Sequence, residues 1–182
     1  MGRVIIFPTD TVYGIGTKIF DTEGIKRIYD IKHRPLDKPL ACLCASIKQI
    51  EEIAIVTPKA RKLINKFLPG PLTVILNSKK EVEEKIGYKT IGIRIPNSSL
   101  ALDLLNDNGP MLTTSVNDSG EVPFNEYDEI YDKYHSLVDM IYPSNLPSSN
   151  LSSTVVLLKD DSFTILREGQ ISKADILSAL ND

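Results

Sequence analysis

The chain has 182 residues, of which 42% are hydrophobic and 25% are charged, and its formal net charge is −3 at pH 7. This length and composition predict one soluble globular domain covering residues 1–182. The slightly acidic balance argues against a protein that coats nucleic acid through bulk charge, although it leaves room for a local basic patch. No segment approaches the ~18 apolar residues of a membrane span, and no signal peptide is evident, which predicts a cytoplasmic protein with no membrane partner.

Short apolar runs alternate with amphipathic ones along the chain. The runs that predict strands are Arg3–Phe7, Leu40–Ala45, Leu72–Asn77, Thr90–Ile95, Met111–Ser115, Leu137–Tyr142, Thr154–Leu158 and Ser162–Arg167. Thr22 is expected to cap one helix, and further helices are expected to begin at Thr57-Pro58, at Ser98 or Ser99, and at Ser172, because these residue types are typical of helix starts. In the last of these helices, Ile176, Leu177 and Leu180 are expected to face the core.

Strands and helices alternate early in the chain, whereas the last two strands read as a hairpin joined through Lys159–Asp161. This mixture predicts an α/β fold with a mixed sheet, not a purely parallel one. The segment from Pro143 to Ser153 is rich in serine, asparagine and proline, and we expect it to be a mobile loop or a lid.

Cysteines and histidines are few. Cys42 and Cys44 form a Cys-x-Cys arrangement, in which residues on one strand face bridge poorly because disulfide geometry is demanding. His33 and His135 do not complete any zinc-ligand spacing. We therefore expect two free, half-buried thiols that serve packing, and no metal held by the protein alone.

Two neighbouring motifs suit a small anionic ligand. Residues 8–16 read Pro-Thr-Asp-Thr-Val-Tyr-Gly-Ile-Gly and end an apolar run, and residues 32–35 read Lys-His-Arg-Pro. The glycines let backbone amides approach a ligand closely. Arg34 can grip a carboxylate or a phosphate with two parallel hydrogen bonds, and Lys32 can act as a point charge. The alternative for Lys32 is a cation that merely offsets the dipole at a helix C-terminus.

Further polar residues lie at later strand ends. Alternation along Ile91–Ile95 puts Arg94 on the opposite face from the isoleucines, where an exposed strand arginine is the alternative to a ligand-binding one. Residues 113–120 form a strand end rich in hydroxyl and amide groups, the kind of place where α/β sheets bind ligands. Ser153 opens one late strand and Arg167 closes the next. The usual glycine-rich nucleotide loops are missing, so side chains and scattered amides would have to hold any nucleotide.

This ordered set of motifs resembles the YrdC-like family of L-threonylcarbamoyladenylate synthases, and the resemblance runs from Pro8 to Gly169. The matching elements are residues 8–16, Lys-His-Arg-Pro at 32–35, Lys-Pro-Leu at 38–40, Pro-Gly-Pro-Leu-Thr at 69–73, Arg-Ile-Pro at 94–96, Thr-Ser-Val-Asn-Asp-Ser-Gly at 114–120, Ser-Thr-Val at 153–155 and Arg-Glu-Gly at 167–169. Many members carry a histidine at the position where this sequence has Leu43.

The resemblance implies a twisted, largely open sheet with a concave, positively charged cavity. It implies a nucleotidyltransferase that joins L-threonine, bicarbonate and ATP, with Mg²⁺ carried by the phosphates, into threonylcarbamoyl-AMP and pyrophosphate. The product would pass to a threonylcarbamoyl-transferase complex that modifies tRNA.

By the same resemblance, Lys32 and Arg34 would be catalytic, and threonine would be bound by Thr9, Arg94 and Ser153. The residues implied around the nucleotide and its phosphates are Lys32, Arg34, Thr113, Ser115, Asn117 and Arg167.

Two other readings stay open at this point. The positive run from Lys26 to Lys38 would also suit a non-catalytic module that grips tRNA or double-stranded RNA through phosphate contacts. A carbamoyl-transfer domain of the kind found in hydrogenase-maturation proteins is the third. Pyrophosphate release that requires threonine and bicarbonate together would separate the synthase from both.

Overall fold

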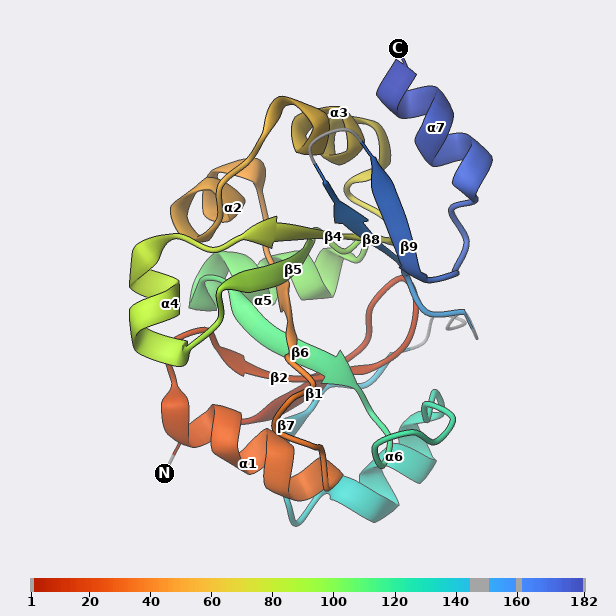
Figure 1. The fold of residues 1–182 in the computed structure, drawn as a ribbon. Coiled ribbons are helices and arrows are strands. Elements are labelled where there is room, and N and C mark those ends of the chain that lie inside the picture. Colours follow the sequence, from red (N-terminus) through yellow and green to blue (C-terminus); the bar gives the residue numbers. More distant parts are fainter. Residues whose placement is uncertain (1, 145–150, 160–161, 182) are drawn as a thin grey trace.

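The computed structural model describes residues 2–144, 151–159 and 162–181 (Figure 1). Within this described part, nine strands lie in one sheet in the order β7-β1-β2-β6-β3-β5-β4-β8-β9. The strands are β1 (Ile5–Phe7), β2 (Gly14–Lys18), β3 (Ala41–Leu43), β4 (Leu72–Asn77), β5 (Thr90–Arg94), β6 (Met111–Ser115), β7 (Met140–Ile141), β8 (Thr154–Leu158) and β9 (Phe163–Arg167). The helices are α1 (Thr22–Lys32), α2 (Ile47–Ile53), α3 (Pro58–Phe67), α4 (Lys80–Ile86), α5 (Ser99–Asn108), α6 (Tyr127–Tyr134) and α7 (Lys173–Asn181).

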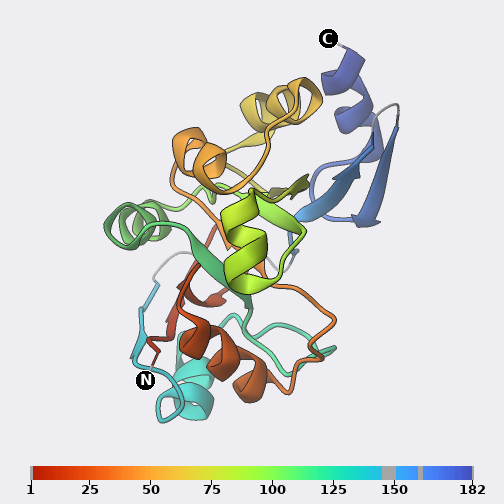
Figure 2. The same ribbon diagram turned by 60° about the vertical axis from the view of Figure 1, so that its left-hand side comes forward.

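The sheet mixes both kinds of strand pairing. Parallel neighbours are β1 with β7, β3 with β5, and β4 with β8, while the remaining pairs are antiparallel. The strands β7 and β9 form the two edges, so the sheet is open. Figures 1 and 2 show that its strands rotate strongly from one edge to the other. The predicted α/β class with an open, twisted, mixed sheet is confirmed.

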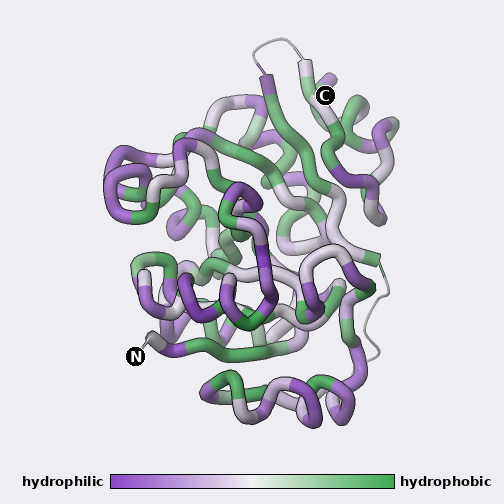
Figure 3. Tube along the Cα trace, turned by 60° about the horizontal axis from the view of Figure 1, so that its bottom comes forward, coloured by the Kyte–Doolittle hydropathy of each residue, from purple (hydrophilic) through white to green (hydrophobic). Residues whose placement is uncertain are grey.

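Helices cover the two faces of the sheet unevenly, and the sheet divides the core in two. The larger cluster includes Ile28 of α1, Leu63 of α3 and Ile130 of α6, all fully buried. The smaller cluster forms where Ala101 and Leu105 of α5 pack on Phe7, Leu43 and Met111 of the sheet. In Figure 3 the hydrophobic stretches follow the strands through the interior, and the polar ones lie mainly on the outer turns.

The strand β2 does not appear among the predicted elements, and it changes the topology. It forms a hairpin with β1 and pairs on its other side with β6. Its sequence, Gly-Ile-Gly-Thr-Lys, gives a weak strand signal because glycine is disfavoured in strands. Here the glycines allow close approach, since a Cβ at Gly14 or Gly16 would lie 2.7 or 2.8 Å from the Thr113 side chain.

Several other expectations need correction. The predicted strand Leu137–Tyr142 is reduced to β7, and the helices α2, α4 and α6 have no predicted counterpart. The cap of α1 is Asp21, whose carboxylate accepts from the backbone N–H of Gly24 at 2.9 Å, so Thr22 is already helical. Leu177 is 43% exposed and does not face the core, whereas Ile176 does.

The two thiols are free and wholly buried, not half-buried as expected. Cys42 lies on β3, and burial raises the pKa of its thiol. Both side chains belong to the larger core cluster. The predicted hairpin between β8 and β9 is present, although residues 160–161 lie outside the described residues. Residues 145–150 of the predicted loop or lid lie outside them as well.

Candidate active site

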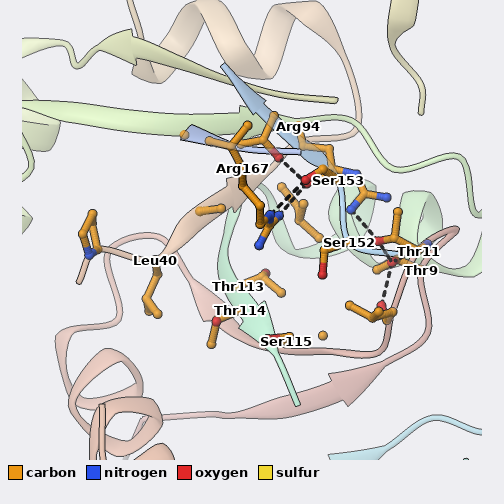
Figure 4. Close-up of a pocket in the computed structure, with 18 of the residues that line it drawn as sticks. Thr9, Thr11, Leu40, Arg94, Thr113, Thr114, Ser115, Ser152, Ser153 and Arg167 are labelled. Carbon is orange, nitrogen blue, oxygen red and sulfur yellow. Dashed lines mark hydrogen bonds between the residues drawn. The ribbon is translucent and has the colours of Figure 1, made fainter. Parts of the chain in front are cut away.

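A cavity of about 290 Å³ opens on the face of the sheet formed by alternate residues of its central strands (Figure 4). Its wall combines a few guanidinium groups with many hydroxyl groups and some apolar side chains. The lining residues used below are Thr9, Thr11, Arg34, Leu43, Thr73, Arg94, Thr113, Thr114, Ser115, Ser152, Ser153 and Arg167. A concave site with a small number of placed polar groups is typical of small-molecule binding.

The loop after β1 is held by its own hydroxyl groups. The Thr9 hydroxyl donates to the carbonyl of Val12 at 2.7 Å, and its oxygen accepts from the backbone N–H of Thr11 at 3.2 Å. The two hydroxyl oxygens of Thr9 and Thr11 lie 3.1 Å apart. Because the Thr9 proton is used on Val12, Thr11 is the donor in this pair. The Thr9 hydroxyl is therefore occupied in shaping the loop, and the expected contact with threonine stays a prediction.

Arg94 is buried in the cavity wall, so the alternative of an exposed strand arginine is wrong. It is 6% exposed, and its guanidinium has three partners from three segments. It donates from Nε to the carbonyl of Gly70 at 3.0 Å, from Nη1 to the Thr11 hydroxyl at 2.7 Å, and from Nη2 to the carboxylate of Asp10. Burial lowers the pKa of Arg94, and the neighbouring Asp10 carboxylate opposes that shift. The result is a charged group held in one orientation.

Arg167 also lines the cavity, and it is fixed to the start of β8. Its Nε donates to the carbonyl of Ser153 and its Nη2 to the Ser153 hydroxyl, both at 3.0 Å. The Ser153 hydroxyl lies 2.8 Å from that of Thr73 on β4, and both side chains are buried. The parallel pairing of β4 with β8 brings these hydroxyls together. Arg94 and Arg167 thus face one cavity from different strands (Figure 4).

Lys32 does not line the cavity, although we expected it to contact phosphate. It is 1% exposed, and its Nζ donates to the backbone carbonyls of Ser115 and Asn117 and to the Asn117 side-chain oxygen, at 2.6, 2.5 and 2.8 Å. All three protons of the ammonium group are used in this way. Burial, with Arg34 nearby, lowers the pKa of Lys32 to about 8.

Arg34 belongs to the cavity wall and sits on a strap formed by residues 33–40. Its Nε donates to the carbonyl of Lys38 and its Nη2 to that of Pro39, both at 2.9 Å. Two tyrosines hold this strap from behind: the Tyr29 hydroxyl donates to the Lys38 carbonyl at 2.9 Å, and the Tyr88 oxygen accepts from the N–H of Leu40 at 3.0 Å.

The end of β6 supplies hydroxyl groups at the floor of the cavity. Thr113 and Ser115 line it, and the Ser115 hydroxyl donates to the side-chain oxygen of Asn117 at 2.8 Å. Asn117 is buried next to this floor and donates to the carbonyl of Glu121 at 2.6 Å. Its amide is thereby committed to the turn that Lys32 also holds. Of the nine site residues predicted from the sequence, seven line the cavity, and Lys32 and Asn117 do not.

Other lining residues were not singled out from the sequence. Thr11 and Thr73 were part of the motifs at 8–16 and 69–73, so the hydroxyl-rich spacing was a usable signal. Asp10 also belongs to the motif at 8–16; it does not line the cavity, but it pairs with Arg94, which is 84 residues away. Leu43, which stands where many members of the resembled family have a histidine, also lines the cavity, whereas Ser152 gave no such signal.

Among the described residues, no group of three or more His, Cys, Asp and Glu side chains comes close enough to hold a metal ion. None of the described helices is both long enough and apolar enough to cross a lipid bilayer.

Comparisons with known proteins show which family the chain belongs to. The model of the Sua5/YciO/YrdC family, described as "Telomere recombination", matches residues 1–169. A putative threonylcarbamoyl-AMP synthase of Methanocaldococcus jannaschii is 35% identical over 170 residues, which are 93% of this chain and 81% of that protein. The threonylcarbamoyl-AMP synthase of Bacillus subtilis is 35% identical over 179 residues, which are 96% of this chain and 52% of that protein.

A solved structure, that of Pyrococcus abyssi Sua5 complexed with L-threonine, superposes with a TM-score of 0.89 at 31% identity. The match covers 98% of this chain and 54% of that one. The chain therefore spans about half the length of the Bacillus and Pyrococcus relatives, and most of the Methanocaldococcus one. On the strength of the family model and these identities, the chain belongs to the Sua5/YciO/YrdC family.

Proposed function

We propose that this protein is an L-threonylcarbamoyladenylate synthase, which makes threonylcarbamoyl-AMP from L-threonine, bicarbonate and ATP and releases pyrophosphate. The observation that carries the proposal is one cavity that gathers three guanidinium groups, from Arg34, Arg94 and Arg167, around a hydroxyl-rich wall. Two substrates in this reaction carry carboxylate or carbonate groups and the third carries phosphates, so fixed cations are what all three require. The names of the relatives and the threonine complex of one of them support the same substrates.

The reaction can be written in two steps. The threonine amine forms a C–N bond with the carbon of bicarbonate, and water leaves, which gives a carbamate. A carbamate oxygen then bonds to the α-phosphorus of ATP, the bond to the β-phosphate oxygen breaks, and pyrophosphate leaves with that electron pair. Such chemistry requires alignment and charge neutralisation more than a dedicated acid or base.

The cavity residues divide these tasks. Arg94, immobile and buried, is the partner we assign to the threonine carboxylate, with the hydroxyls of Thr11 and Ser153 in the same cavity for its other polar groups. Arg34 and Arg167 are the cations we assign to the phosphates. Mg²⁺ enters as part of the ATP substrate, bound by phosphates and water. Lys32 and Asn117 act in this proposal by fixing the floor next to Ser115.

The alternative hypothesis, a non-catalytic RNA-binding module, is less well supported than the synthase. Of the five cations between Lys26 and Lys38, Lys32 is buried, Arg27 is paired with Asp139 at 2.7 Å, and Arg34 donates to carbonyls of its own strap. The positive run therefore does not present a continuous exposed charge. We propose that the product passes in the cytoplasm to a threonylcarbamoyl-transferase complex that modifies tRNA; whether tRNA also contacts this protein is a separate question for binding assays.

Mass spectrometry tests the proposed function directly. The purified protein, given ATP, Mg²⁺, L-threonine and labelled bicarbonate, should form an AMP adduct that carries the label, with one pyrophosphate released for each adduct. Omission of threonine or of bicarbonate should abolish both signals. Pyrophosphate release that persists without threonine would contradict the assignment.

A further inference from the structure

Asp10 has no role in the proposed chemistry, yet it contacts the most deeply buried guanidinium of the cavity. Its carboxylate accepts from Nη2 of Arg94, and the two side chains are 14% and 7% exposed. A buried cation without a partner is costly, and it persists in folded proteins when a counter-ion and hydrogen bonds accompany it. Asp10 is thus the group that allows Arg94 to stay charged in the wall.

The three partners of Arg94 also fix the plane of its guanidinium. Asp10 and Thr11 bind the two terminal nitrogens, and the carbonyl of Gly70 binds Nε from the other side. The Gly70 carbonyl is itself held, because the Gly70 N–H donates to Ile95 at 2.9 Å and a Cβ at this position would lie 2.5 Å from the Phe67 carbonyl. An arginine has five N–H bonds, and contacts with the described residues use three of those of Arg94, so two remain.

Asp10 lies beside the cavity and not in it. Arg94 and Thr11 are part of the lining, whereas Asp10 is not. A carboxylate in this place does not occupy the cavity space that a substrate carboxylate would fill. Asp10 is therefore placed to hold Arg94 from outside the cavity lining.

We propose that Asp10 is a positioning residue, the permanent counter-ion that holds Arg94 so that its two free N–H bonds bind the carboxylate of the amino-acid substrate. This inference rests on the proposed function, because it takes threonine as that substrate. Asp10 acts through Arg94 and has no contact with the nucleotide, so its loss affects the two substrates unequally.

The test compares Asp10→Ala and Asp10→Asn with the parent protein by steady-state kinetics and by calorimetric titration with threonine. Asp10→Ala should raise the KM for threonine about tenfold or more, with the KM for ATP changed less than twofold. Asp10→Asn keeps an oxygen that accepts from Arg94 and should restore the threonine KM to within about threefold of the parent. Glu51→Ala, which removes the carboxylate of the exposed pair between Glu51 and Arg61, is the matched control and should change neither KM.

Three results would overturn the inference: an unchanged threonine KM in Asp10→Ala, an equal rise of both KM values, or tighter threonine binding in both variants, which would make Asp10 a competitor of the substrate. The ion pair is also tested without any substrate, by urea unfolding of Asp10→Ala, Arg94→Ala and the double variant. Strictly additive losses of the free energy of unfolding would show that Asp10 and Arg94 do not interact, and would overturn the inference. The parent protein could also fail to form a threonine-dependent adduct while the variants lose unfolding free energy non-additively. That combination would support the pairing of Asp10 with Arg94 and would contradict only the proposed function.

Discussion

Lys32 and Arg34 lie two residues apart at the end of α1, and the turn at His33 gives them different surroundings. His33 has a φ of 48°, and the N–H of Arg34 donates to the carbonyl of Tyr29 at 3.0 Å, a helix ending in the left-handed conformation. Lys32 is enclosed by the turn at 115–117, whereas Arg34 is half-buried and lines the cavity. The comparison teaches that one short motif supplies a cation buried in a turn and another cation that lines the cavity.

The largest effect is expected from Lys32→Met. It removes three hydrogen bonds from a charged donor and leaves the carbonyls of Ser115 and Asn117 without that partner. We expect product formation to fall roughly a hundred- to thousandfold and the free energy of unfolding to fall by about 1–3 kcal/mol. Activity assays and urea unfolding measure both, and Lys85→Met, at an exposed i,i+4 pair, is the control. Lost activity with unchanged stability would instead favour direct contact of Lys32 with phosphate.

The pH dependence of stability gives a second measure of the enclosure of Lys32. Its pKa is about 8 in the folded protein, against about 10.4 for a lysine in an unfolded chain. Between these two values the unfolded chain holds a proton that the folded protein has lost, so the free energy of unfolding rises with pH. The rise should be roughly 2–3 kcal/mol larger in the parent than in Lys32→Met. Identical pH profiles for the two proteins would show that Lys32 is open to solvent.

Arg34→Lys should affect chemistry and leave stability alone. Lysine keeps the charge but loses the planar fork that donates to two carbonyls and to a ligand at once. We expect a ten- to hundredfold fall in kcat/KM, since a charged hydrogen bond is worth about 1.5–3 kcal/mol. The unfolding midpoint should match that of the parent and of the control Arg61→Lys. An unchanged kcat/KM would mean that only the charge of Arg34 matters, as on a phosphate-binding RNA surface.

The smallest effect is expected from Tyr88→Phe, which weakens the support of the Arg34 strap. The Tyr88 oxygen accepts from the Leu40 N–H and lies 3.0 Å from the Tyr29 hydroxyl. Since one neutral hydrogen bond contributes about 1 kcal/mol, the KM for ATP should rise about three- to tenfold. The KM for threonine, which we assign to Arg94, should stay within twofold. Equal changes in both values would show that the strap does not act through Arg34 alone.

Local sequence signals predicted most of the strands and the helix starts at Thr57 and Ser98, because apolar periodicity and capping residues depend on near neighbours. They failed for β2, because Gly14 and Gly16, which allow close approach to Thr113, are residues more typical of loops. The candidate site was likewise predictable only where the signal was local in the sequence. Motif order placed Arg34 and Arg94 in one cavity, but the direction of Lys32 depends on carbonyls 83 and 85 residues away. Asp10 stayed unnoticed because its importance arises only from its contact with Arg94.

The strand order has a consequence for how the protein is made. One part of the cavity lining comes from the loop at Thr9 and Thr11, and another part comes from Ser153 and Arg167, so the two are separated by most of the chain. The pairing of β4 with β8, near the β9 edge of the sheet, joins Thr73 to Val155 in parallel register. Pairings between such distant residues form slowly, because a long loop must close first. During synthesis on the ribosome, the growing chain therefore lacks part of the cavity lining until Arg167 has emerged, and binding of the proposed substrates, threonine and ATP, should report the finished fold.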